Sequence, residues 1–386
     1  MPLDHSLITH HLQQMVSVNS INPDLAPGGA GEGEISAWLL ELCRDELGLE
    51  VRMFEAAPDR HNVVAYWRGN GSGKSLLLTG HTDTVGIENM TGDPFDGRVE
   101  GNRLYGRGSY DMKGGLAAVL GAVAALKADG YQPAGDVILG FVCDEEYASI
   151  GMDAFVAEEI SADAAILVEP TDNDIVIAHK GFAWLTLTTT GRAAHGSLYT
   201  EGVDAIAHMG RLLTDLETFE DETLGRKDHP LLGRPSVHAS RIKGGLGWST
   251  YPDACELKVE HRLLPDEADA DAINLWKKAI ARQHKDDPAF HAEVAVDLFR
   301  PGYEIRRDAP IVAALHKAVV DKTGAEPLYA GMWAWMDSAV LGSAGIPTVI
   351  YGPSGEGAHA AVEYVYLDSV FRCAAIYAGL IRAWCG

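Results

Sequence analysis

The first third of the chain alternates between helix-like and strand-like patterns of apolar residues. Apolar positions recur every three or four residues over 35–47 and in the alanine-rich segment 115–127, a spacing that predicts helices. Short, nearly continuous apolar runs typical of strands buried on both faces lie at 62–67, 75–79, 136–142 and 164–168. This alternation predicts an α/β domain with a mixed, largely parallel sheet covered by helices.

The pattern changes near residue 180. Residues 182–190 (FAWLTLTTT) alternate apolar and polar side chains, which predicts a half-exposed antiparallel strand. The same alternation returns at 256–261, with helical spacing at 202–219 and 270–284, whereas the first style resumes with helices at 311–322 and 368–384 and a strand at 347–351. We therefore expect an inserted α+β domain at residues 181–293 between the two parts of the α/β domain, 1–180 and 294–386.

The charge balance and the cysteines restrict the partners and the compartment. Lys and Arg number 31 against 55 Asp and Glu, a formal net charge of −24. Such a surface repels phosphate backbones and anionic lipid, so we expect no nucleic-acid partner and no membrane partner. The five cysteines form no paired motif, and the N-terminus has no signal-peptide pattern. These features predict a cytoplasmic protein.

Two segments resemble well-known motifs without satisfying them. Residues 68–75 (RGNGSGKS) resemble a phosphate-binding loop, but Arg68 replaces its first glycine and a strand pattern follows where a helix is required. We interpret this segment as a surface hairpin turn. Residues 352–357 (GPSGEG) place Glu356 where a nucleophile elbow needs glycine, so we do not expect Ser354 to be a nucleophile.

Acidic residues and histidines gather in five short segments where an apolar run meets turn-forming residues. The segments are 80–86 (GHTDTVG), 106–115 (GRGSYDMKGG), 144–146 (DEE), 169–171 (EPT) and 357–359 (GAH). Each has an ordinary explanation when taken alone, such as a helix cap or a solvated carboxylate. Together they lie at the ends of predicted strands, where open α/β sheets form their crevices. They offer enough imidazoles and carboxylates for two divalent cations, and such a pair with a spare carboxylate is a hydrolytic site.

The spacing within these segments suggests how the work is divided. His81 and Asp83 can point to the same side, and a metal-binding imidazole usually donates its second N–H to a carboxylate. Asp111 precedes the alanine-rich helix, where both of its oxygens could bridge two cations. Of the adjacent Glu145 and Glu146, one can bind a metal while the other stays free as a base.

In their residues and in their order along the chain, these segments resemble those of the co-catalytic metallopeptidases and deacylases. This family includes acetylornithine deacetylase, succinyl-diaminopimelate desuccinylase, aminoacylase and carboxypeptidase G. The resemblance covers nearly the whole chain. It implies that Asp111 bridges two metals, that His81 and Glu169 complete one site, and that Glu146 and His359 complete the other. It also implies a cis peptide bond after Asp111, and Glu145 as general base with Asp83 orienting His81.

The resemblance also implies an activity. The α/β domain would be the catalytic domain, hydrolysing an amide bond of an N-acyl amino acid or a small peptide-like substrate with water activated between the metals. A dipeptidase or aminopeptidase with the same metal site is the alternative, and a catalytically silent binding protein is a remote one. Imidazole and carboxylate ligands without thiolate suit Zn²⁺, with Co²⁺ or Mn²⁺ as further candidates.

The inserted domain resembles the lid and dimerisation domain of the same family. Its segment 191–197 (GRAAHGS) implies that His195 reaches the active site of the partner subunit in a homodimer and helps to hold the oxyanion. Tyr199 stands where the family commonly has proline, which leaves the shape of this loop open. Arg262 matches the arginine expected to bind a substrate carboxylate, a salt bridge along its strand being the alternative.

Two departures from the family pattern concern the substrate. Around Ser249 the chain reads GWSTYP instead of asparagine before proline, and before Asp337 it reads GMWAWMD instead of a glycine turn. These positions make Ser249 and Asp337 candidate substrate-binding residues. Trp248, Trp333 and Trp335 are candidates to line the pocket, which predicts a bulkier or more apolar substrate than acetylornithine. The alternative is that the tryptophans belong to the core.

Overall fold

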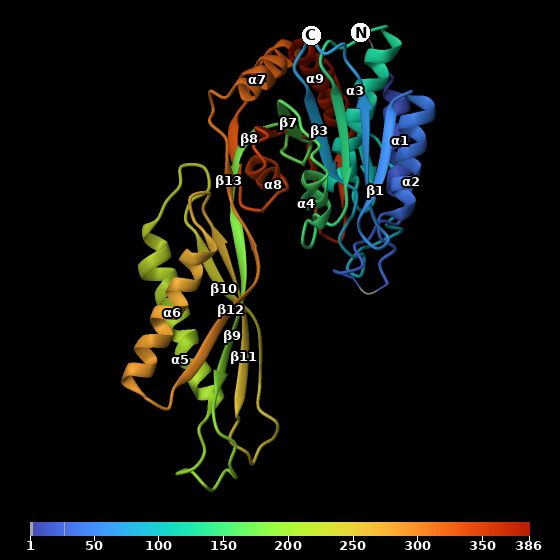
Figure 1. The fold of residues 1–386 in the computed structure, drawn as a ribbon. Coiled ribbons are helices and arrows are strands. Elements are labelled where there is room, and N and C mark those ends of the chain that lie inside the picture. The colour runs from blue at the N-terminus through green and yellow to red at the C-terminus, as the bar shows by residue number, and fades with distance from the viewer. Residues whose placement is uncertain (1–2, 27) are drawn as a thin grey trace. The chain divides into compact units, whose positions relative to one another are not determined.

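The computed structural model describes residues 3–26 and 28–386 and divides into two compact units (Figure 1). Unit 1 contains the described residues up to Ile177 together with Ile305–Ala330 and Met336–Gly386, and unit 2 contains Ala178–Glu304 and Gly331–Trp335. Among the described residues, no helix has the length and apolar character needed to cross a membrane.

The predicted end of the inserted domain at residue 293 falls inside a strand. Strand β12 (His291–Arg300) pairs with β9 (Gly181–Thr190) from His291 to Arg300. Because this pairing holds the whole strand to the sheet of unit 2, this unit continues to Glu304.

A mixed sheet forms the framework of unit 1 and confirms the predicted α/β class. Its strands lie in the order β1 (Glu50–Ala57), β2 (Arg60–Trp67), β6 (Val137–Val142), β3 (Leu76–His81), β7 (Ala164–Leu167), β15 (Thr348–Ile350) and β8 (Ile175–His179), with β14 (Tyr329–Met332) also pairing with β8. The last two residues of β8 belong to unit 2, where they pair with β13 (Tyr303–Glu304). The neighbours β6, β3, β7 and β15 are parallel, whereas the flanking pairs are antiparallel. The parallel strands are the fully buried apolar runs that the sequence pattern indicates.

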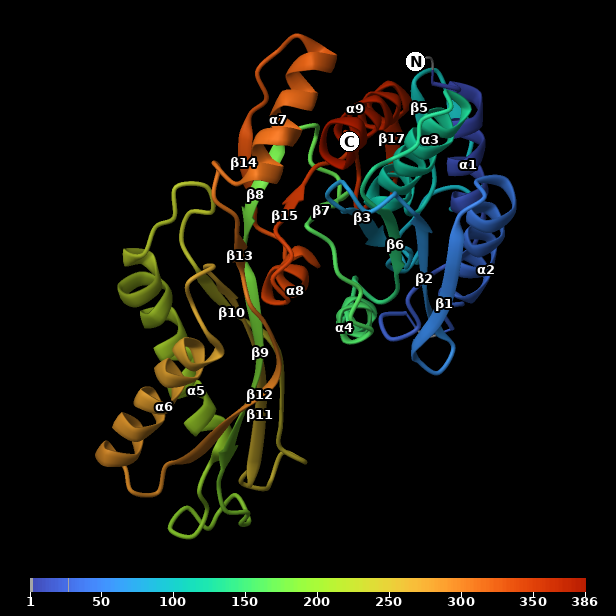
Figure 2. The same ribbon diagram turned by 45° about the horizontal axis from the view of Figure 1, so that its top comes forward.

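Helices cover both faces of this sheet (Figure 2). One group contains α1 (His5–Ser17), α2 (Gly33–Glu41) with a π-helical continuation (Leu42–Glu46), α3 (Gly114–Ala128), α7 (Pro310–Thr323) and α9 (Leu367–Cys385), and the other contains α4 (Ile150–Ala157) and α8 (Ser338–Ser343). Successive residues of β3 face the two groups in turn. Leu77 packs with Phe155 and Leu341 of the second group. Gly80 faces Met112 and Leu116, which lie before and in the first turn of α3.

A smaller sheet lies beside the start of α3. Its strands are β16 (Gly355–Glu356), β17 (Tyr364–Tyr366), β5 (Arg103–Tyr105) and β4 (Val99–Glu100), all antiparallel. This sheet joins the segment that precedes Asp111 to the segment that follows His359.

The interpretation of residues 68–75 as a hairpin turn is wrong. Strand β6 lies between β2 and β3, so this segment crosses the end of β6 instead of joining two paired strands. The Gly69 N–H donates to Asp136 Oδ1 at 2.8 Å and the Gly71 N–H to the Ala134 carbonyl at 2.9 Å. These hydrogen bonds therefore attach the turn-forming residues to the segment that leads into β6.

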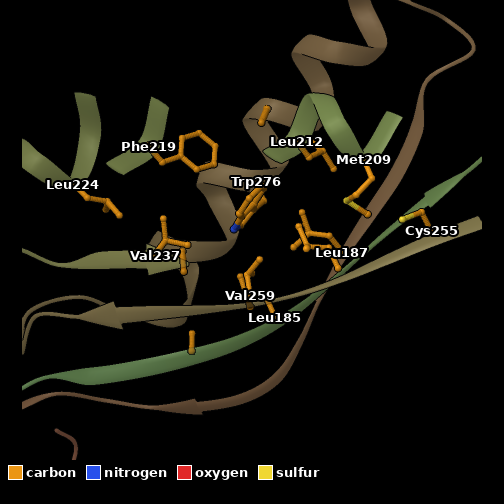
Figure 3. Packing of buried hydrophobic residues seen from close by; sticks show 14 of the residues in the cluster. Leu185, Leu187, Met209, Leu212, Phe219, Leu224, Val237, Cys255, Val259 and Trp276 are labelled. Atoms are coloured by element: carbon orange, nitrogen blue, oxygen red, sulfur yellow. The ribbon is translucent and has the colours of Figure 1, made fainter. Parts of the chain in front are cut away.

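Unit 2 is an antiparallel sheet with helices on one face. The strands lie in the order β10 (Ser236–Gly244), β11 (Ala254–Leu263), β9 and β12, and the helices are α5 (Ala205–Thr218) and α6 (Asp269–Asp286), with short turns at Phe219–Thr223 and Leu224–Arg226. Figure 3 shows Trp276 of α6 in the core between helices and sheet, close to Val237 and Val259. Its Nε1–H donates to His261 Nε2 at 2.8 Å, which satisfies the buried indole.

Candidate metal centre

The residues of the candidate centre follow the ends of the parallel strands of unit 1. Strands β6, β3, β7 and β15 are neighbours that run in one direction, so their carboxyl ends meet at one edge of the sheet. His81 ends β3, while Glu145 and Glu146 follow β6 and Glu169 follows β7. His359 lies in the turn between β16 and β17, beyond the end of β15. The parallel register therefore assembles side chains that are far apart in sequence.

Asp111 reaches this edge from the other direction. It lies in the irregular segment Ser109–Lys113 that leads into α3, and its bond to Met112 is a cis peptide, as the family resemblance implies. Helix α3 approaches the end of β7 so closely that a Cβ at Gly115 would lie 2.0 Å from the Val168 carbonyl oxygen. Glycine at that position therefore allows the segment carrying Asp111 to reach the strand ends.

Asp111 lies between the two imidazoles. Its Oδ1 is 3.3 Å from His81 Nε2, and its Oδ2 is 3.4 Å from His359 Nε2. On the far side, His359 Nε2 lies 3.0 Å from Glu146 Oε2. Because each oxygen of one carboxylate faces a different imidazole, the carboxylate is arranged as a bridge between two positions.

Two overlapping sets of side chains could each hold a cation. Ligand atoms of His81, Asp111 and Glu146 lie within 4.8 Å of one another, and so do those of His81, Glu145 and Glu169. Glu169 Oε1 lies 3.7 Å from His81 Nε2 and accepts no hydrogen bond from the described residues although it is buried. A buried carboxylate oxygen of this kind fits a metal ligand, since a cation would satisfy it.

The tautomer of His81 is set by the main chain. Nδ1 lies 2.9 Å from the carbonyl oxygen of Asp83 and 3.5 Å from its Oδ1. Nδ1–H therefore donates to the carbonyl, so that Nε2 is the ring nitrogen that faces Asp111. The Asp83 carboxylate instead accepts the N–H groups of Glu145 at 3.1 Å and Glu146 at 3.2 Å, so it also shapes the turn that carries both glutamates.

The electrostatics of the centre favour a cation. Burial raises the pKa of Glu145, Glu146 and Glu169, and neighbouring carboxylates add to this effect. Hydrogen bonds to Asp111 and Glu146 raise the pKa of His359 to about 10. Negative charge is thus concentrated in a region of low dielectric, and its nitrogen and oxygen donors without thiolate match the preferences of Zn²⁺.

The loop carrying His359 requires an unusual backbone. Gly357 has φ +85°, and a Cβ there would lie 1.8 Å from the Val362 carbonyl oxygen, so only glycine fits. His359 itself has φ +60°, a left-handed conformation that is uncommon for residues other than glycine. Such conformations cluster at functional sites, where surrounding contacts maintain them.

A buried ion pair fastens this loop to the segment of Asp111. Arg107 NH1 lies 2.5 Å from Glu363 Oε2, and both side chains are only 1 % exposed. The other oxygen of Glu363 accepts the N–H groups of Tyr110 and Asp111 at 3.1 Å, while Arg107 NH2 donates to the Ala360 carbonyl at 3.3 Å. The pair therefore joins the residues next to His359 to the backbone of Asp111.

Unit 2 contains the other predicted site residues, apart from Asp337. His195 is exposed, with Nδ1 2.8 Å from Ser197 Oγ. An isolated β-bridge to Thr250 places the segment of His195 beside Ser249. Arg262 donates from Nε to Glu260 Oε1 at 2.7 Å. The salt bridge along the strand, which was the alternative for Arg262, is therefore present in unit 2.

The candidate pocket residues differ sharply in exposure. Trp248 is fully exposed and Trp333 is 72 % exposed, whereas Trp335 is buried. The Trp335 Nε1–H donates to the Pro301 carbonyl at 3.0 Å and its ring meets Phe182 edge-on, so Trp335 packs inside unit 2 in the way the core alternative describes.

Asp337 has a different place from the one predicted for a substrate-binding residue. Its side chain is 0 % exposed, it precedes α8, and it accepts a short hydrogen bond from Ser149 Oγ. Its charge contributes to the raised pKa values of Glu145 and Glu169. A fully buried carboxylate offers a substrate no accessible surface.

Several buried polar residues that support the centre are given no role by the sequence motifs, although Arg107 and Asp144 lie within two of the five segments. They are Asn22, Glu32, Arg60, Arg107, Asp144 and Glu363, all buried. The usable signal is the position of charged residues beside apolar runs, since Arg60 opens the buried strand β2 and Glu363 precedes β17. Their partners lie far away in sequence and become visible only in the fold.

Comparisons with known proteins place these features in a family context. The model of peptidase family M20/M25/M40 matches residues 77–383. The chain is 30 % identical over 338 residues to acetylornithine deacetylase from Myxococcus xanthus, covering 86 % of both proteins. Its fold is similar to a tripeptidase from Staphylococcus aureus (TM-score 0.81, 21 % identity, 99 % of both chains) and to a dinuclear metal-binding peptidase from Bacillus subtilis (TM-score 0.75, 16 % identity, 98 % of both chains).

The Arg107–Glu363 pair generates a prediction about stability. Glu363→Gln leaves a buried guanidinium without its counter-charge, so we expect the free energy of unfolding to fall by about 3–5 kcal/mol. Glu50→Gln is the matched control, because it breaks a bidentate pair with Arg68 whose side chains are 62 % and 49 % exposed, and should cost at most about 1 kcal/mol. Urea unfolding followed by tryptophan fluorescence measures both, and equal small losses would contradict the assigned role.

Proposed function

We propose that this chain, which belongs to peptidase family M20/M25/M40, hydrolyses an amide bond in a metal-dependent reaction. The proposed substrate is an N-acyl amino acid or a related peptide-like molecule. The observation that carries the proposal is the Asp111 carboxylate, with one oxygen towards His81 and the other towards His359. Beside it lies Glu145, whose side chain is only 11 % exposed. Similarity to relatives named acetylornithine deacetylase supports cleavage of an N-acyl group.

The proposed cofactor is a pair of divalent cations. Asp111 would contact both, His81 and Glu169 would complete one position, and Glu146 and His359 would complete the other. The donor chemistry supports Zn²⁺, with Co²⁺ or Mn²⁺ as further candidates. The description of the Bacillus subtilis relative as a dinuclear metal-binding peptidase supports the number of ions.

Glu145 is the proposed general base. When bound, the metal pair lowers the pKa of water and polarises the scissile carbonyl. The Glu145 carboxylate would accept the proton of the attacking water and deliver it to the leaving nitrogen, so that the acid and the free amine depart. Asp83 supports this role because it holds the Glu145 N–H, and His81 supports it because Nε2 lies 3.9 Å from Glu145 Oε2.

Unit 2 is the proposed lid and dimerisation domain of a homodimer. Strand β10 is at the edge of its sheet, and both of its faces are exposed from His238 to Gly244. Ile242 is 55 % exposed and Leu246 is 91 % exposed, with Ile206 of α5 adjacent to Gly244. An unpaired edge strand with exposed apolar side chains beside it favours pairing with a second copy, which would carry His195 to the partner's centre.

The proposed location is the cytoplasm. The five cysteines are buried, and none forms a disulfide within the described residues. Unpaired thiols of this kind are typical of reducing compartments.

The substrate class is tested with a panel of purified substrates. In the presence of Zn²⁺ or Co²⁺, we expect turnover of N-acyl amino acids, with aromatic or long acyl groups preferred to acetyl groups because the exposed Trp248 adds apolar surface. Trp248→Ala should reduce this preference by roughly tenfold, the value of one to two lost apolar contacts. Acetyl preference would contradict the apolar pocket, whereas activity confined to peptides with a free α-amine would favour the dipeptidase or aminopeptidase alternative.

The roles of Glu145 and His195 are tested together by mixing variants. Glu145→Ala should lower kcat at least ~10²-fold without loss of metal, because it removes only the base. His195→Ala should also be nearly inactive while binding metal normally. If His195 acts across a dimer, subunit exchange between the two variants should restore about a quarter of the wild-type activity, since half of the random dimers contain one intact site of two.

Two outcomes of the mixing experiment would overturn these roles. Near-normal turnover by Glu145→Ala would remove it as the base, and absence of recovery after verified subunit exchange would place His195 outside the partner's site. Glu158→Ala is the matched control, because Glu158 is exposed and pairs with Arg52 on the surface.

A further inference from the structure

A buried polar network lies directly behind the candidate centre. It contains Asn22, Glu32, Arg60, Asp83 and Asp144, each at most 5 % exposed. These residues come from the loop between α1 and α2, the N-cap position of α2, the start of β2 and the loops after β3 and β6. The candidate metal ligands do not account for this network, because apart from Asp83 none of its side chains approaches the imidazoles in the contacts of the described residues.

Arg60 is the hub of the network. Its Nε and NH2 donate to the two oxygens of Glu32 at 2.8 and 2.7 Å, a bidentate arrangement. NH2 also donates to Asp144 Oδ1 at 2.9 Å, and NH1 to Asp24 Oδ2 at 2.6 Å. Only a planar fork can pair bidentately with Glu32 and contact Asp144 at the same time, because a lysine is a single point charge without this geometry.

Asp144 extends the network into the turn that carries Glu145 and Glu146. It has φ +66°, a left-handed conformation that favours glycine. Its Oδ1 accepts from Arg60, its Oδ2 accepts the Ile150 N–H at 3.2 Å, and its own N–H donates to Glu32 Oε1 at 3.3 Å. These bonds hold the residue before Glu145 in a conformation that would otherwise be unfavourable.

Asn22 closes the network on the other side. Its Nδ2 donates to Asp144 Oδ1 at 2.9 Å and to Asp83 Oδ2 at 2.8 Å. Asp83 in turn accepts the N–H groups of Glu145 and Glu146. A continuous chain of hydrogen bonds therefore runs from the Arg60 guanidinium to the backbone of both glutamates.

Stability alone is a weak reason for such a network. Burying Glu32, Asp83 and Asp144 around a single guanidinium carries a large desolvation cost, and a buried ion pair is often no more stable than a well-packed apolar replacement. The hydrogen bonds lead to the turn of the proposed base, and catalysis depends on placing such a group within a fraction of an ångström.

We propose that Arg60 is a positioning residue for Glu145 and Glu146, acting through Asp144 and through the Asn22–Asp83 bridge. The inference rests on the proposed function, in which Glu145 is the base and Glu146 a metal ligand. Arg60 touches neither substrate nor metal in this account. Its guanidinium fixes the turn, so that the Glu145 carboxylate is placed as the base and the Glu146 carboxylate as the metal ligand.

The decisive experiment compares Arg60→Lys with Arg68→Lys in the full-length protein. Arg68 is a matched control, because it also donates bidentately to one carboxylate, Glu50, and singly to a second, Asp136, but at an exposed position remote from the centre. We expect Arg60→Lys to lower kcat by roughly 10- to 100-fold with little change in KM, since the turn is displaced while the substrate contacts remain. Arg68→Lys should leave both constants unchanged.

Two further readouts separate positioning from general stability. Hydrogen exchange measured on peptides spanning residues 143–147 should accelerate in Arg60→Lys, because the N–H groups of Glu145 and Glu146 lose a fixed acceptor. With Zn²⁺ in excess, the metal content should reach the wild-type value, so that the fall in kcat is not explained by a missing metal. Asn22→Ala provides a second route if Arg60→Lys does not fold, and it should show the same fall in kcat and the same local exchange.

The outcomes distinguish this inference from the proposed function. If Arg60→Lys and Asn22→Ala match Arg68→Lys in kcat and in exchange at residues 143–147, Arg60 is not a positioning residue. The same conclusion follows if activity is lost only in proportion to folded protein. If the wild-type protein hydrolyses no amide in the panel, the proposed function fails, and the exchange data alone then decide whether Arg60 holds the turn.

Discussion

The placement of one carboxylate between two imidazoles is the constraint on which the candidate centre depends. Asp111 must reach the carboxyl ends of strands that themselves carry His81, Glu146 and Glu169. This requires the close approach of α3 to β7 that Gly115 permits, and the left-handed loop before His359 that Gly357 permits. Buried carboxylates concentrated in this way repel one another unless positive charge lies among them.

The surrounding structure supports this arrangement with two buried guanidinium groups. Arg107 and Glu363 join the Asp111 segment to the His359 loop, and Arg60 with Glu32 holds the turn of Glu145 and Glu146 through Asp144. Each guanidinium neutralises buried carboxylates next to the centre, and those carboxylates in turn bind main-chain N–H groups of the segments that carry the candidate ligands. The positive charges of Arg60 and Arg107 thus order the backbone around the centre, while the candidate metal ligands remain available to bind cations.

Much of the framework can be predicted from sequence because it depends on local patterns. Continuous apolar runs identify β3, β6 and β7, and the residues just after them identify most of the candidate ligands, since the ends of parallel strands meet at one edge. The buried polar network around Arg60 cannot be predicted in this way. Arg60 finds Glu32 and Asp144 only after β2 has paired with β6, and the same insertion of β6 makes the hairpin interpretation of residues 68–75 wrong.

Side-chain direction is the other part that sequence does not determine. His81 donates to the carbonyl of Asp83 instead of its carboxylate, which is free to organise the glutamate turn. Trp335 and Asp337 are close in sequence, yet one packs on Phe182 in unit 2 and the other is buried near Glu145 and Glu169 in unit 1. Such differences depend on packing with distant residues.

The most direct measurement of the central claim is the number of metal ions bound per chain, determined by titrating the chelator-treated protein with Zn²⁺ and following amide hydrolysis at each addition. The account predicts two ions per chain, with activity reaching its maximum as the second position fills. Binding of a single ion with full activity, or full activity without any added metal, would contradict the bridging role of Asp111.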